Sequence, residues 1–291
     1  MPSIRVHAWG GLGSQLFAVA LIYDLQRRFP KRRITLVLHE GGVTKRISEI
    51  DYLFTLIKKI KKSDFIESKS SFDPLVKNLA AQSRNEKKLS SKIKNFLLRS
   101  GILGSANSNE EFTRLRFWVF EIRGHYSYRT ISIDTLKQIY TEIEIASGSP
   151  NDIELLENSV AVHYRLGDLT KLSSKGPIKK DDLKIILISL HEYQNLNCLI
   201  FSDSPKLAGE LLVGAWNPRK LLMVDVSSLK MLWQASNSKI FIGTNSKLSI
   251  WAALFIMFKN VDSTMYMPKQ LMNNFEKIIA TELIDSNRNY Y

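Results

Sequence analysis

The most informative stretch of the chain runs V-A-V-H-Y-R-L-G-D-L-T, from Val160 to Thr170. Residues 160–162 are small and apolar, which predicts a short buried strand, and a polar cluster follows without a spacer. Ligands of open α/β sheets bind outside the carboxyl ends of the strands, so His163, Arg165 and Asp168 are expected at a binding edge. Arginine presents a planar, permanently charged fork that suits two phosphate oxygens. The alternative is a strand-end turn with a surface ion pair.

Strands and helices alternate on both sides of this stretch, which predicts parallel sheets covered on both faces. Strands are expected at 4–8, 34–38, 117–122, 160–162, 198–201, 221–224 and 239–242. Helices are expected at 16–28, 131–145, 180–193, 206–212, 228–236 and 250–258. The Ser- and Gly-containing run 147–151 is the expected linker. The sequence therefore predicts two Rossmann-like α/β domains, 1–149 and 150–291, that face a cleft.

The chain of 291 residues has a formal net charge of +13, which suits nucleic acid, anionic lipid or a phosphorylated substrate. No basic-aromatic ladder, zinc-ligand spacing or helix-turn-helix pattern favours nucleic acid. The region 58–108 is basic and rich in serine, so we expect it to be peripheral, with helical pieces at 74–81 and 92–98. The other explanation of the charge is a set of solvated lysine faces that keep the protein soluble.

Cys198 is the only cysteine and lies in an apolar run, so it is expected to be a buried small hydrophobe rather than half of a disulfide. The amino terminus lacks the layout of a signal peptide. The longest apolar run, 248–258, is far shorter than the roughly 20 residues that a membrane span requires. These features predict a cytoplasmic protein that touches a membrane surface at most peripherally.

A glycine-rich turn, G-G-L-G-S-Q at 10–15, joins the first strand to the first helix. Glycine allows close approach of a ligand to the backbone, and a helix start presents free N–H groups. Gly11, Leu12, Gly13, Ser14 and Gln15 are therefore candidates for a backbone-lined anion site. The spacing is neither G-x-G-x-x-G nor a Walker A loop, and a tight strand-to-helix connection is the alternative.

Four stretches together resemble one family, the bacterial α-1,2-fucosyltransferases. The run G-G-L-G-S-Q-L-F at 10–17 is similar to that family's G-G-L-G-N-Q-[LM]-F, and H-Y-R-L-G-D at 163–168 resembles its H-x-R-x-G-D. F-S-D at 201–203 matches a strand end of the family, and N-S-K-L-S-I-W-A-A at 245–253 is similar to N-S-T-F-S-W-W-A-A. A fifth, shorter stretch, G-H-Y-S at 124–127, is similar to the family's G-Y-x-Q-S. The matches fall in the family's order over nearly the whole chain.

The chain departs from the family pattern in or beside the expected donor pocket. Ser14 replaces an asparagine, the pair Lys247-Leu248 replaces Thr-Phe, and Ile250 replaces a tryptophan. Leu166 stands where many members carry a second arginine. The departures bear more on the identity of the donor sugar than on the fold or on glycosyl transfer.

The resemblance implies a GT-B fold and inverting transfer of L-fucose from GDP-fucose to a sugar hydroxyl, without metal or further cofactor. The sequence contains no Asp-x-Asp pair to carry a divalent ion to a pyrophosphate, so fixed donors are expected to neutralise the leaving diphosphate. The expected donor-binding residues beyond the glycine-rich turn are Asp203, Asn245, Ser246, Lys247 and Ser249. Asp203 is expected to accept hydrogen bonds from the base or ribose, or alternatively to cap a helix or turn.

The incoming hydroxyl of the acceptor needs a base, or a site that tolerates an oxocarbenium-like transition state without one. The expected catalytic group is Arg165, His163 and Asp168, and the candidates for the base are Glu40, His39, His125 and Asp168. Spacing does not single out any of them.

The acceptor is expected to be a glycan of bacterial surface polysaccharide, O-antigen or capsule, or its lipid-linked precursor. The basic first domain, above all the cluster Lys58–Lys62, is expected to dock on an anionic membrane surface or a phosphorylated lipid carrier. Two alternatives remain: the same fold with another nucleotide-sugar donor, and a catalytically silent protein that binds polysaccharide or nucleic acid in the same basic cleft.

Overall fold

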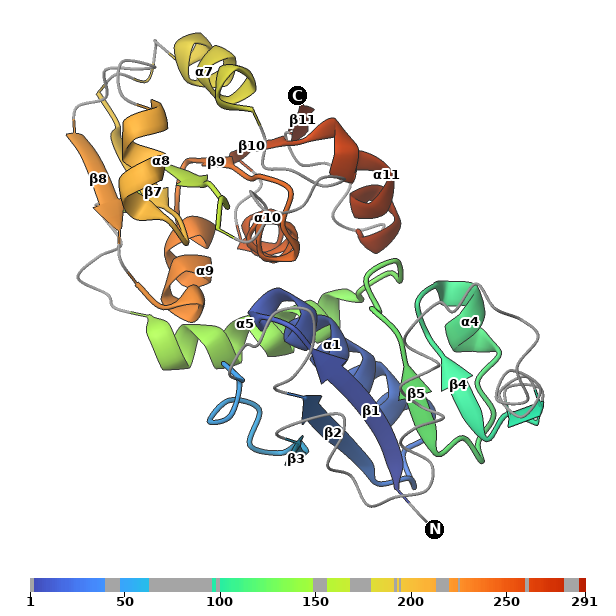
Figure 1. Ribbon diagram of the computed structural model, residues 1–291. Coiled ribbons are helices and arrows are strands. Elements are labelled where there is room, and N and C mark those ends of the chain that lie inside the picture. The colour runs from blue at the N-terminus through green and yellow to red at the C-terminus, as the bar shows by residue number, and fades with distance from the viewer. Residues whose placement is uncertain are drawn as a thin grey trace. The chain divides into compact units, whose positions relative to one another are not determined.

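The structure is a computed structural model that describes residues 3–39, 48–62, 96–97, 100–148, 156–167, 179–190, 193, 195–212, 220–224, 226–259, 262–279 and 288–291. The chain divides into two compact units, unit 1 (Met1–Ile131) and unit 2 (Ser132–Tyr291). Each unit is built around one parallel sheet (Figure 1). The predicted α/β class with two Rossmann-like units is confirmed. The relative arrangement of the units that a GT-B fold implies stays a prediction.

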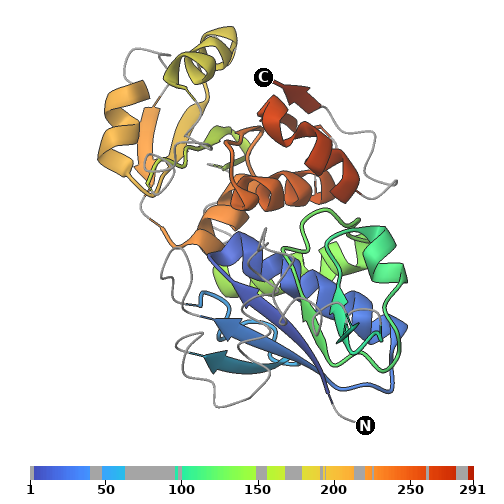
Figure 2. The ribbon, with the colours of Figure 1, turned by 45° about the vertical axis from the view of Figure 1, so that its right-hand side comes forward.

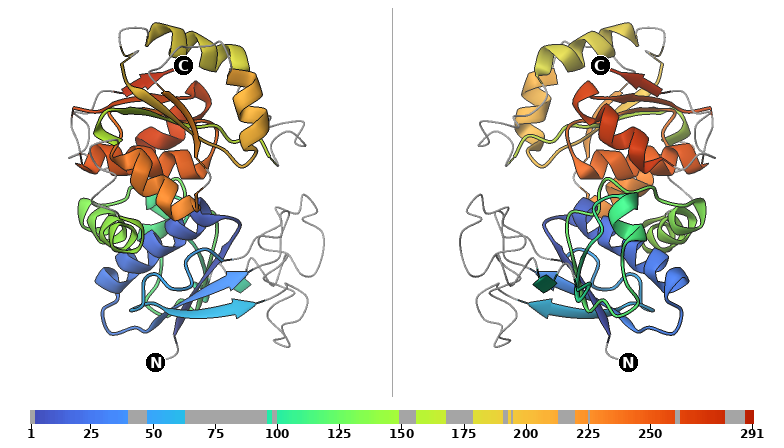
Figure 3. Two further views of the ribbon diagram at one scale, coloured as in Figure 1. Left: turned by 90° about the vertical axis from the view of Figure 1, so that its left-hand side faces the viewer. Right: turned by 90° about the vertical axis from the view of Figure 1, so that its right-hand side faces the viewer.

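Unit 1 contains a five-stranded sheet in the order β3-β2-β1-β5-β4. Helix α1 packs against β1 and β2, and β3 runs beside β2 in the same direction (Figure 3). The elements are β1 (Ile4–Trp9), α1 (Leu12–Arg28), β2 (Ile34–His39), β3 (Lys58–Lys62), β4 (Leu103–Ser105), α4 (Asn109–Thr113) and β5 (Glu121–Arg123).

Unit 2 contains a six-stranded sheet in the order β8-β7-β6-β9-β10-β11. Helix α8 packs against β7 and β8, and α7 packs against α8 (Figure 2). The elements are α5 (Ile133–Ser147), β6 (Ser159–His163), α7 (Lys180–Ser189), β7 (Asn197–Phe201), α8 (Pro205–Leu212), β8 (Lys220–Val224), α9 (Ser228–Ser236), β9 (Ile240–Ile242), α10 (Lys247–Lys259), β10 (Thr264–Met267), α11 (Lys269–Ile278) and β11 (Arg288–Tyr290).

The helices α1 and α10 form the centre of their units. Both are apolar on nearly every side, and residues 249–257 of α10 are all buried. A helix that is hydrophobic all round belongs in a protein core, so the apolar run at 248–258 is core rather than surface. Arg27 and Arg28 in the last turn of α1 complement the negative end of its dipole.

The two units divide between Ile131 and Ser132, whereas the sequence analysis expected the linker at 147–151. Helix α5 belongs to unit 2 because the ring of Tyr140 packs against Phe255, with ring centroids 5.3 Å apart, and against Phe258 at 5.8 Å. Ser132 caps this helix by accepting a hydrogen bond from the amide of Thr135.

The structure corrects the sequence analysis on the strands of unit 1. Lys58–Lys62 was expected in a peripheral region, but it forms the edge strand β3. The sequence K-K-I-K-K shows no alternation of apolar and polar residues, so it did not predict a strand. Edge strands commonly carry lysine, which hinders pairing with the strand of another molecule. The strand predicted at 117–122 is limited to Glu121–Arg123, and β4 was not predicted.

At the carboxyl end of the chain, β10, α11 and β11 were not predicted. In β10 the buried Met265 and Met267 alternate with partly exposed residues, but four residues are too few for the alternation to stand out in the sequence. The predicted helical piece 74–81 lies outside the described residues, as does most of 92–98.

Candidate functional site

The strand order of unit 2 locates a topological switch point. Strands β7 and β8 extend the sheet on one side of β6, whereas β9, β10 and β11 extend it on the other. The loops that leave the carboxyl ends of β6 and β9 therefore diverge at their junction. Ligands of open α/β sheets bind at such a point, so the β6–β9 edge is the candidate site.

Thr244 joins the ends of β6 and β9. Its hydroxyl donates to the carbonyl oxygen of His163 at 2.8 Å and accepts from the amide of Arg165 at 3.2 Å. The backbone on both sides of Tyr164 is thereby fixed, and Arg165 leaves the sheet from an anchored position with its side chain partly exposed. Sequence reasoning missed Thr244, although a hydroxyl residue directly after a strand and one glycine was a usable signal.

His163 is buried at the end of β6 and contacts Ser249 of α10. The His163 Nδ1 to Ser249 Oγ distance is 2.7 Å, and the same Oγ accepts from the amide of Thr244 at 3.0 Å. The hydroxyl of Ser249 thus joins the ring of His163 to the backbone at Thr244. Ser249, expected to bind the donor, uses its hydroxyl inside the protein.

Burial and, to a smaller extent, the positive charge of Arg165 lower the pKa of His163 to about 4, while Asp203 opposes the shift. The ring is therefore neutral at neutral pH. His163 contributes position rather than charge, and the permanent charge at this edge belongs to Arg165.

Asp203 holds the loop that follows β6. Its Oδ1 accepts from the amides of Leu166 and Gly167, at 2.9 and 3.0 Å. A Cβ on residue 167 would lie 2.4 Å from Asp203 Oδ2, so the close approach requires glycine. An open depression of about 410 Å³ lies beside Asp203 and is lined by Ser204, Pro205, Lys206, Leu207 and Glu210.

Helix α10 begins at the same edge. Ser246 precedes it, and its Oγ accepts from the amide of Leu248 at 3.2 Å. Asn245 donates a hydrogen bond to Gln270 Oε1 at 3.3 Å. Lys247 is the first residue of α10, and its side chain is partly exposed. The positive end of the helix dipole and Lys247 therefore favour an anion on the side of the sheet from which Arg165 leaves.

The glycine-rich turn of unit 1 is held by hydrogen bonds from Gln15 and Glu49, which belong to the same unit. The φ of Gly10 is +86°, and Gln15 Nε2 donates to the carbonyl oxygen of Gly10 at 2.8 Å. Glu49 Oε1 accepts from the amide of Leu12 at 3.1 Å, and the Glu49 amide donates to Gln15 Oε1 at 3.2 Å. A carboxylate thus stands where the sequence analysis expected a phosphate. Glu49 was not predicted, and no local pattern marks it.

The other members of the predicted turn set lie in the first turn of α1. Gly13 is buried, whereas Ser14 is partly exposed. Among the candidate bases, His125 is exposed and its amide donates to Asn107 Oδ1 at 2.7 Å. Glu40 and Asp168 lie outside the described residues.

A buried polar cluster occupies one face of the sheet of unit 1. Along β1, Ile4, Val6 and Ala8 alternate with Arg5, His7 and Trp9, so the two sets lie on opposite faces. His7 is fully buried, and its ring contacts His39, Glu121 and Arg123. The sequence analysis noted the alternation but drew no site from it, although three polar or aromatic residues on one face were the signal.

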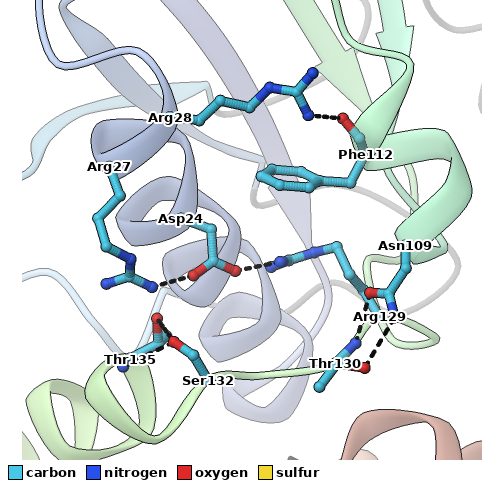
Figure 4. Close-up of polar contacts among 9 residues, drawn as sticks. All are labelled: Asp24, Arg27, Arg28, Asn109, Phe112, Arg129, Thr130, Ser132 and Thr135. Atoms are coloured by element: carbon cyan, nitrogen blue, oxygen red, sulfur yellow. Dashed lines mark hydrogen bonds and ion pairs between the residues drawn. The ribbon is translucent and has the colours of Figure 1, made fainter.

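Several basic residues of unit 1 hold its irregular segments. Arg28 Nη2 donates to the carbonyl oxygens of Thr113 and Leu115, at 2.8 and 3.0 Å, and Arg28 also bonds that of Phe112 (Figure 4). Arg32 bonds the carbonyl oxygens of Phe117 and Val119. The amide of Val119 donates to the carbonyl oxygen of Arg116, so the segment before β5 forms a turn rather than a strand.

Asp24 on α1 pairs with both Arg27 and Arg129 (Figure 4). In β3, Lys61 pairs with Asp51, and Lys59 Nζ contacts backbone carbonyl oxygens, among them that of Phe54 at 3.2 Å. A large part of the charge expected to face a membrane therefore serves the fold.

In the part of the chain that the structure describes, no three His, Cys, Asp or Glu side chains are grouped to hold a metal ion. None of the described helices is long and apolar enough to cross a membrane.

No family model matches the chain, and no curated protein matches its sequence. Solved structures match with low similarity. The heptosyltransferase WaaC of E. coli with ADP has 8% identity and a TM-score of 0.43 over 99% of this chain and 93% of its own. The UDP-GlcNAc 2-epimerase of Neisseria meningitidis has 11% identity and a TM-score of 0.44 over 97% and 88%. POFUT1 in complex with GDP-fucose has 10% identity and a TM-score of 0.38 over 100% and 98%.

Proposed function

We propose that the protein is an inverting, metal-independent glycosyltransferase that transfers L-fucose from GDP-fucose to a hydroxyl of a glycan, forming an α-1,2 linkage. One observation carries the proposal: the anchored Arg165 and the start of α10 meet at the switch point between β6 and β9. A diphosphate suits this pair, because a guanidinium binds two oxygens and a helix start offers amide donors.

In the proposed reaction the acceptor oxygen attacks C1 of the sugar from the face opposite the diphosphate. The bond between C1 and the phosphate oxygen breaks, and its electron pair leaves with GDP. Arg165 and the first turn of α10 stabilise the negative charge that grows on the leaving group, which is the role that a fixed donor performs best. His163, Ser249 and Thr244 keep these donors in place, so no reorganisation is needed as the charge develops.

The proposed acceptor is a glycan of bacterial surface polysaccharide, O-antigen or capsule, or its lipid-linked precursor at the cytoplasmic face of the membrane. Because Lys59 and Lys61 are engaged in the fold, we propose the membrane contact at residues 116–118, which precede β5 on the amino-terminal side of the unit 1 sheet. There Phe117 is 59% exposed and Trp118 41% exposed, beside the exposed Arg116. Aromatic rings with basic neighbours suit the interface of an anionic bilayer.

A second candidate keeps the reaction and changes the nucleotide-sugar donor. It is favoured by Lys247 and Ser14, which depart from the fucosyltransferase pattern and have partly exposed side chains. A thermal-shift panel of GDP-, UDP-, CMP- and dTDP-sugars with the full chain tests both candidates. Stabilisation by GDP-fucose above the others supports fucosyl transfer, whereas a larger shift with another sugar nucleotide supports the second candidate.

Hydrolysis separates an enzyme from a silent binding protein. A glycosyltransferase with an activated donor releases GDP slowly from GDP-fucose in the absence of acceptor, because water replaces the sugar hydroxyl. A protein that binds a sugar nucleotide without releasing the nucleotide, with or without acceptor, would be a binding module instead.

A further inference from the structure

Tyr291 reaches the β6–β9 edge of unit 2 from a strand that the proposed site does not include. It directly follows β11, which lies at the end of the strand order. Its amide donates to the carbonyl oxygen of Met267 at 3.0 Å, and its own carbonyl oxygen accepts from the amide of Lys269 at 2.7 Å. From this fixed backbone the phenolic hydroxyl donates to the carbonyl oxygen of Gly243 at 2.8 Å. Gly243 directly follows β9, so Tyr291 bonds the edge at which Arg165 is anchored.

The peptide bond between Gly243 and Thr244 is held at both of its polar groups. Its carbonyl oxygen accepts from Tyr291, and its amide donates to Ser249 Oγ at 3.0 Å. A peptide unit is planar, so two such bonds define its orientation. The hydroxyl of Thr244 in turn accepts from the amide of Arg165 at 3.2 Å. The orientation of this one peptide therefore determines how Thr244 meets the end of β6.

The conformation of Gly243 depends on hydrogen bonds rather than on a side chain. A Cβ at this position would lie 2.6 Å from Met267 Sδ, so only glycine fits. Glycine is also the residue with the most backbone freedom, which leaves the bonds around it to select one conformation. Because Gly243 is buried, its carbonyl oxygen needs a donor from the protein. If the hydroxyl of Tyr291 is removed, the peptide is expected to turn toward another donor, and Thr244 moves with it.

The phenol of Tyr291 is a permanent donor. Its ring is partly buried and packs against the apolar core that β6, α7 and β7 share. Burial raises the pKa of Tyr291 far above the ordinary value of a phenol, and Asp182 and Tyr164 act in the same direction. The hydroxyl therefore keeps its proton over the whole working range of pH. This excludes a role as a base and leaves the bond to Gly243 as what the hydroxyl contributes to the edge.

The neighbouring Tyr290 provides a natural comparison. Successive side chains of a strand point to opposite faces, so Tyr290 lies on the other face of the sheet. Its hydroxyl bonds Glu276 of α11, which also pairs with Arg288 at 2.9 Å. Tyr290 and Tyr291 thus each bond one distant element through a phenol, but only the bond of Tyr291 reaches the end of β9.

We propose that Tyr291 is a positioning residue of the donor site, because its hydroxyl holds the Gly243–Thr244 peptide in the orientation from which Thr244 anchors Arg165. This proposal rests on the proposed function. Tyr291 acts through the protein rather than by contact with the donor. A guanidinium binds two oxygens of a diphosphate only when its plane is correctly placed, so a shift of its backbone is felt in the affinity for GDP.

The variant Tyr291→Phe tests the role of the hydroxyl, with Tyr290→Phe as its matched control. Phenylalanine keeps the ring and its packing, and each variant loses one hydroxyl. Calorimetric titration of GDP into the full-length proteins should show a Kd about threefold to tenfold higher for Tyr291→Phe, the range expected for one hydrogen bond. The Kd for Tyr290→Phe should stay within about twofold of wild type. Unchanged affinity in Tyr291→Phe would overturn the proposal, and so would an equal loss in Tyr290→Phe.

A double-mutant cycle tests whether Tyr291 acts through Arg165. Residues that act through one contact are not additive, so Tyr291→Phe should change the Kd of GDP by less than about twofold in an Arg165→Ala background. A residue that only stabilises the fold would weaken binding equally in both backgrounds. An undiminished loss in Arg165→Ala would therefore overturn the positioning role.

Amide hydrogen exchange tests the anchoring without any ligand. In the full-length protein the amides of Thr244 and Arg165 should exchange faster in Tyr291→Phe than in wild type, and at the wild-type rate in Tyr290→Phe. Equal exchange in all three proteins would overturn the proposal. If GDP does not bind the wild type, the proposed function fails and the proposal falls with it. If GDP binds wild type and Tyr291→Phe equally, the proposed function stands and only the role of Tyr291 is lost.

Discussion

The two sheets use polar side chains in different ways. At the β6–β9 edge of unit 2, Thr244, Ser249 and Asp203 bond backbone groups or a neutral His163, and the result is a fixed backbone beside one permanent charge. In unit 1 the side chains of Glu121, His7 and His39 bond one another. The bonds in unit 2 fix the backbone beside Arg165, whereas those in unit 1 join titratable side chains to one another.

The two arrangements suit different chemical tasks. A leaving diphosphate needs donors that do not reorganise, and an incoming hydroxyl needs a base whose tautomer is set. Helix α1 begins with a carboxylate, Glu49, at the amide of Leu12, whereas α10 begins beside Lys247 and a serine cap. The electrostatics at the two helix starts therefore favour an anion in unit 2.

Of the predicted changes, Arg165→Lys is expected to have the largest effect on the rate of transfer. Lysine keeps the positive charge but loses the planar fork, so kcat should fall by about tenfold or more while the fold is preserved. Steady-state kinetics with GDP-fucose measure it. Arg114→Lys is the matched control, because Arg114 is an exposed arginine that pairs with Glu110. A near-wild-type rate for Arg165→Lys would assign the leaving-group role to another residue.

The neutral state of His163 predicts a pH effect on stability. Its pKa is lowered from 6.5 to about 4 by burial, so the unfolded chain takes up a proton on this histidine between these values and the native chain does not. The free energy of unfolding should therefore be fully retained above about pH 6.5 and should decline as the pH falls toward 4. Urea denaturation across this range should show a shallower decline in His163→Gln. Identical pH dependence in the two proteins would mean that His163 is protonated in the native state.

The exposed aromatic pair Phe117 and Trp118 provides a further test within unit 1. Replacing Phe117 and Trp118 by serine should weaken binding to vesicles of anionic phospholipid by about tenfold, since partial burial of two aromatic side chains is lost. Co-sedimentation at low and high salt measures it, and Leu56→Ser, at another exposed apolar residue, is the control. Binding that is absent, or indifferent to lipid charge and to the aromatic pair, would leave the exposed charge as an aid to solubility.

The smallest effect is expected from chelation. If fixed donors at the β6–β9 edge replace a divalent ion, excess EDTA should leave transfer unchanged. A collapse of activity that Mg²⁺ or Mn²⁺ restores would contradict the fixed-charge account of unit 2.

The sequence predicted unit 2 better than unit 1, for identifiable reasons. The strands β6 and β7 are continuous apolar runs whose ends carry His163 and Asp203, so both the strand and the polar edge were visible. The lysine-rich β3 has no such pattern, because an edge strand is stabilised by pairing with β2 rather than by an apolar face.

Contacts distant in sequence account for what the site prediction missed. Glu49 reaches the start of α1 from a segment 37 residues away, and Glu121 reaches His7 across 114 residues. Neither pair has a spacing that a motif could record. Asp203 was predicted from its place at a strand end, but its bonds to the backbone of the β6 loop required the neighbouring strand in three dimensions.

The most direct test of the central claim is calorimetric titration of GDP into the full-length protein and into its Arg165→Ala variant. If the β6–β9 edge of unit 2 holds the donor diphosphate, GDP should bind the wild type at a single site, more tightly than UDP, CMP or dTDP. Its affinity for Arg165→Ala should then be at least about tenfold lower. Equal affinity of GDP for the two proteins, or the absence of binding by all four nucleotides, would contradict the account.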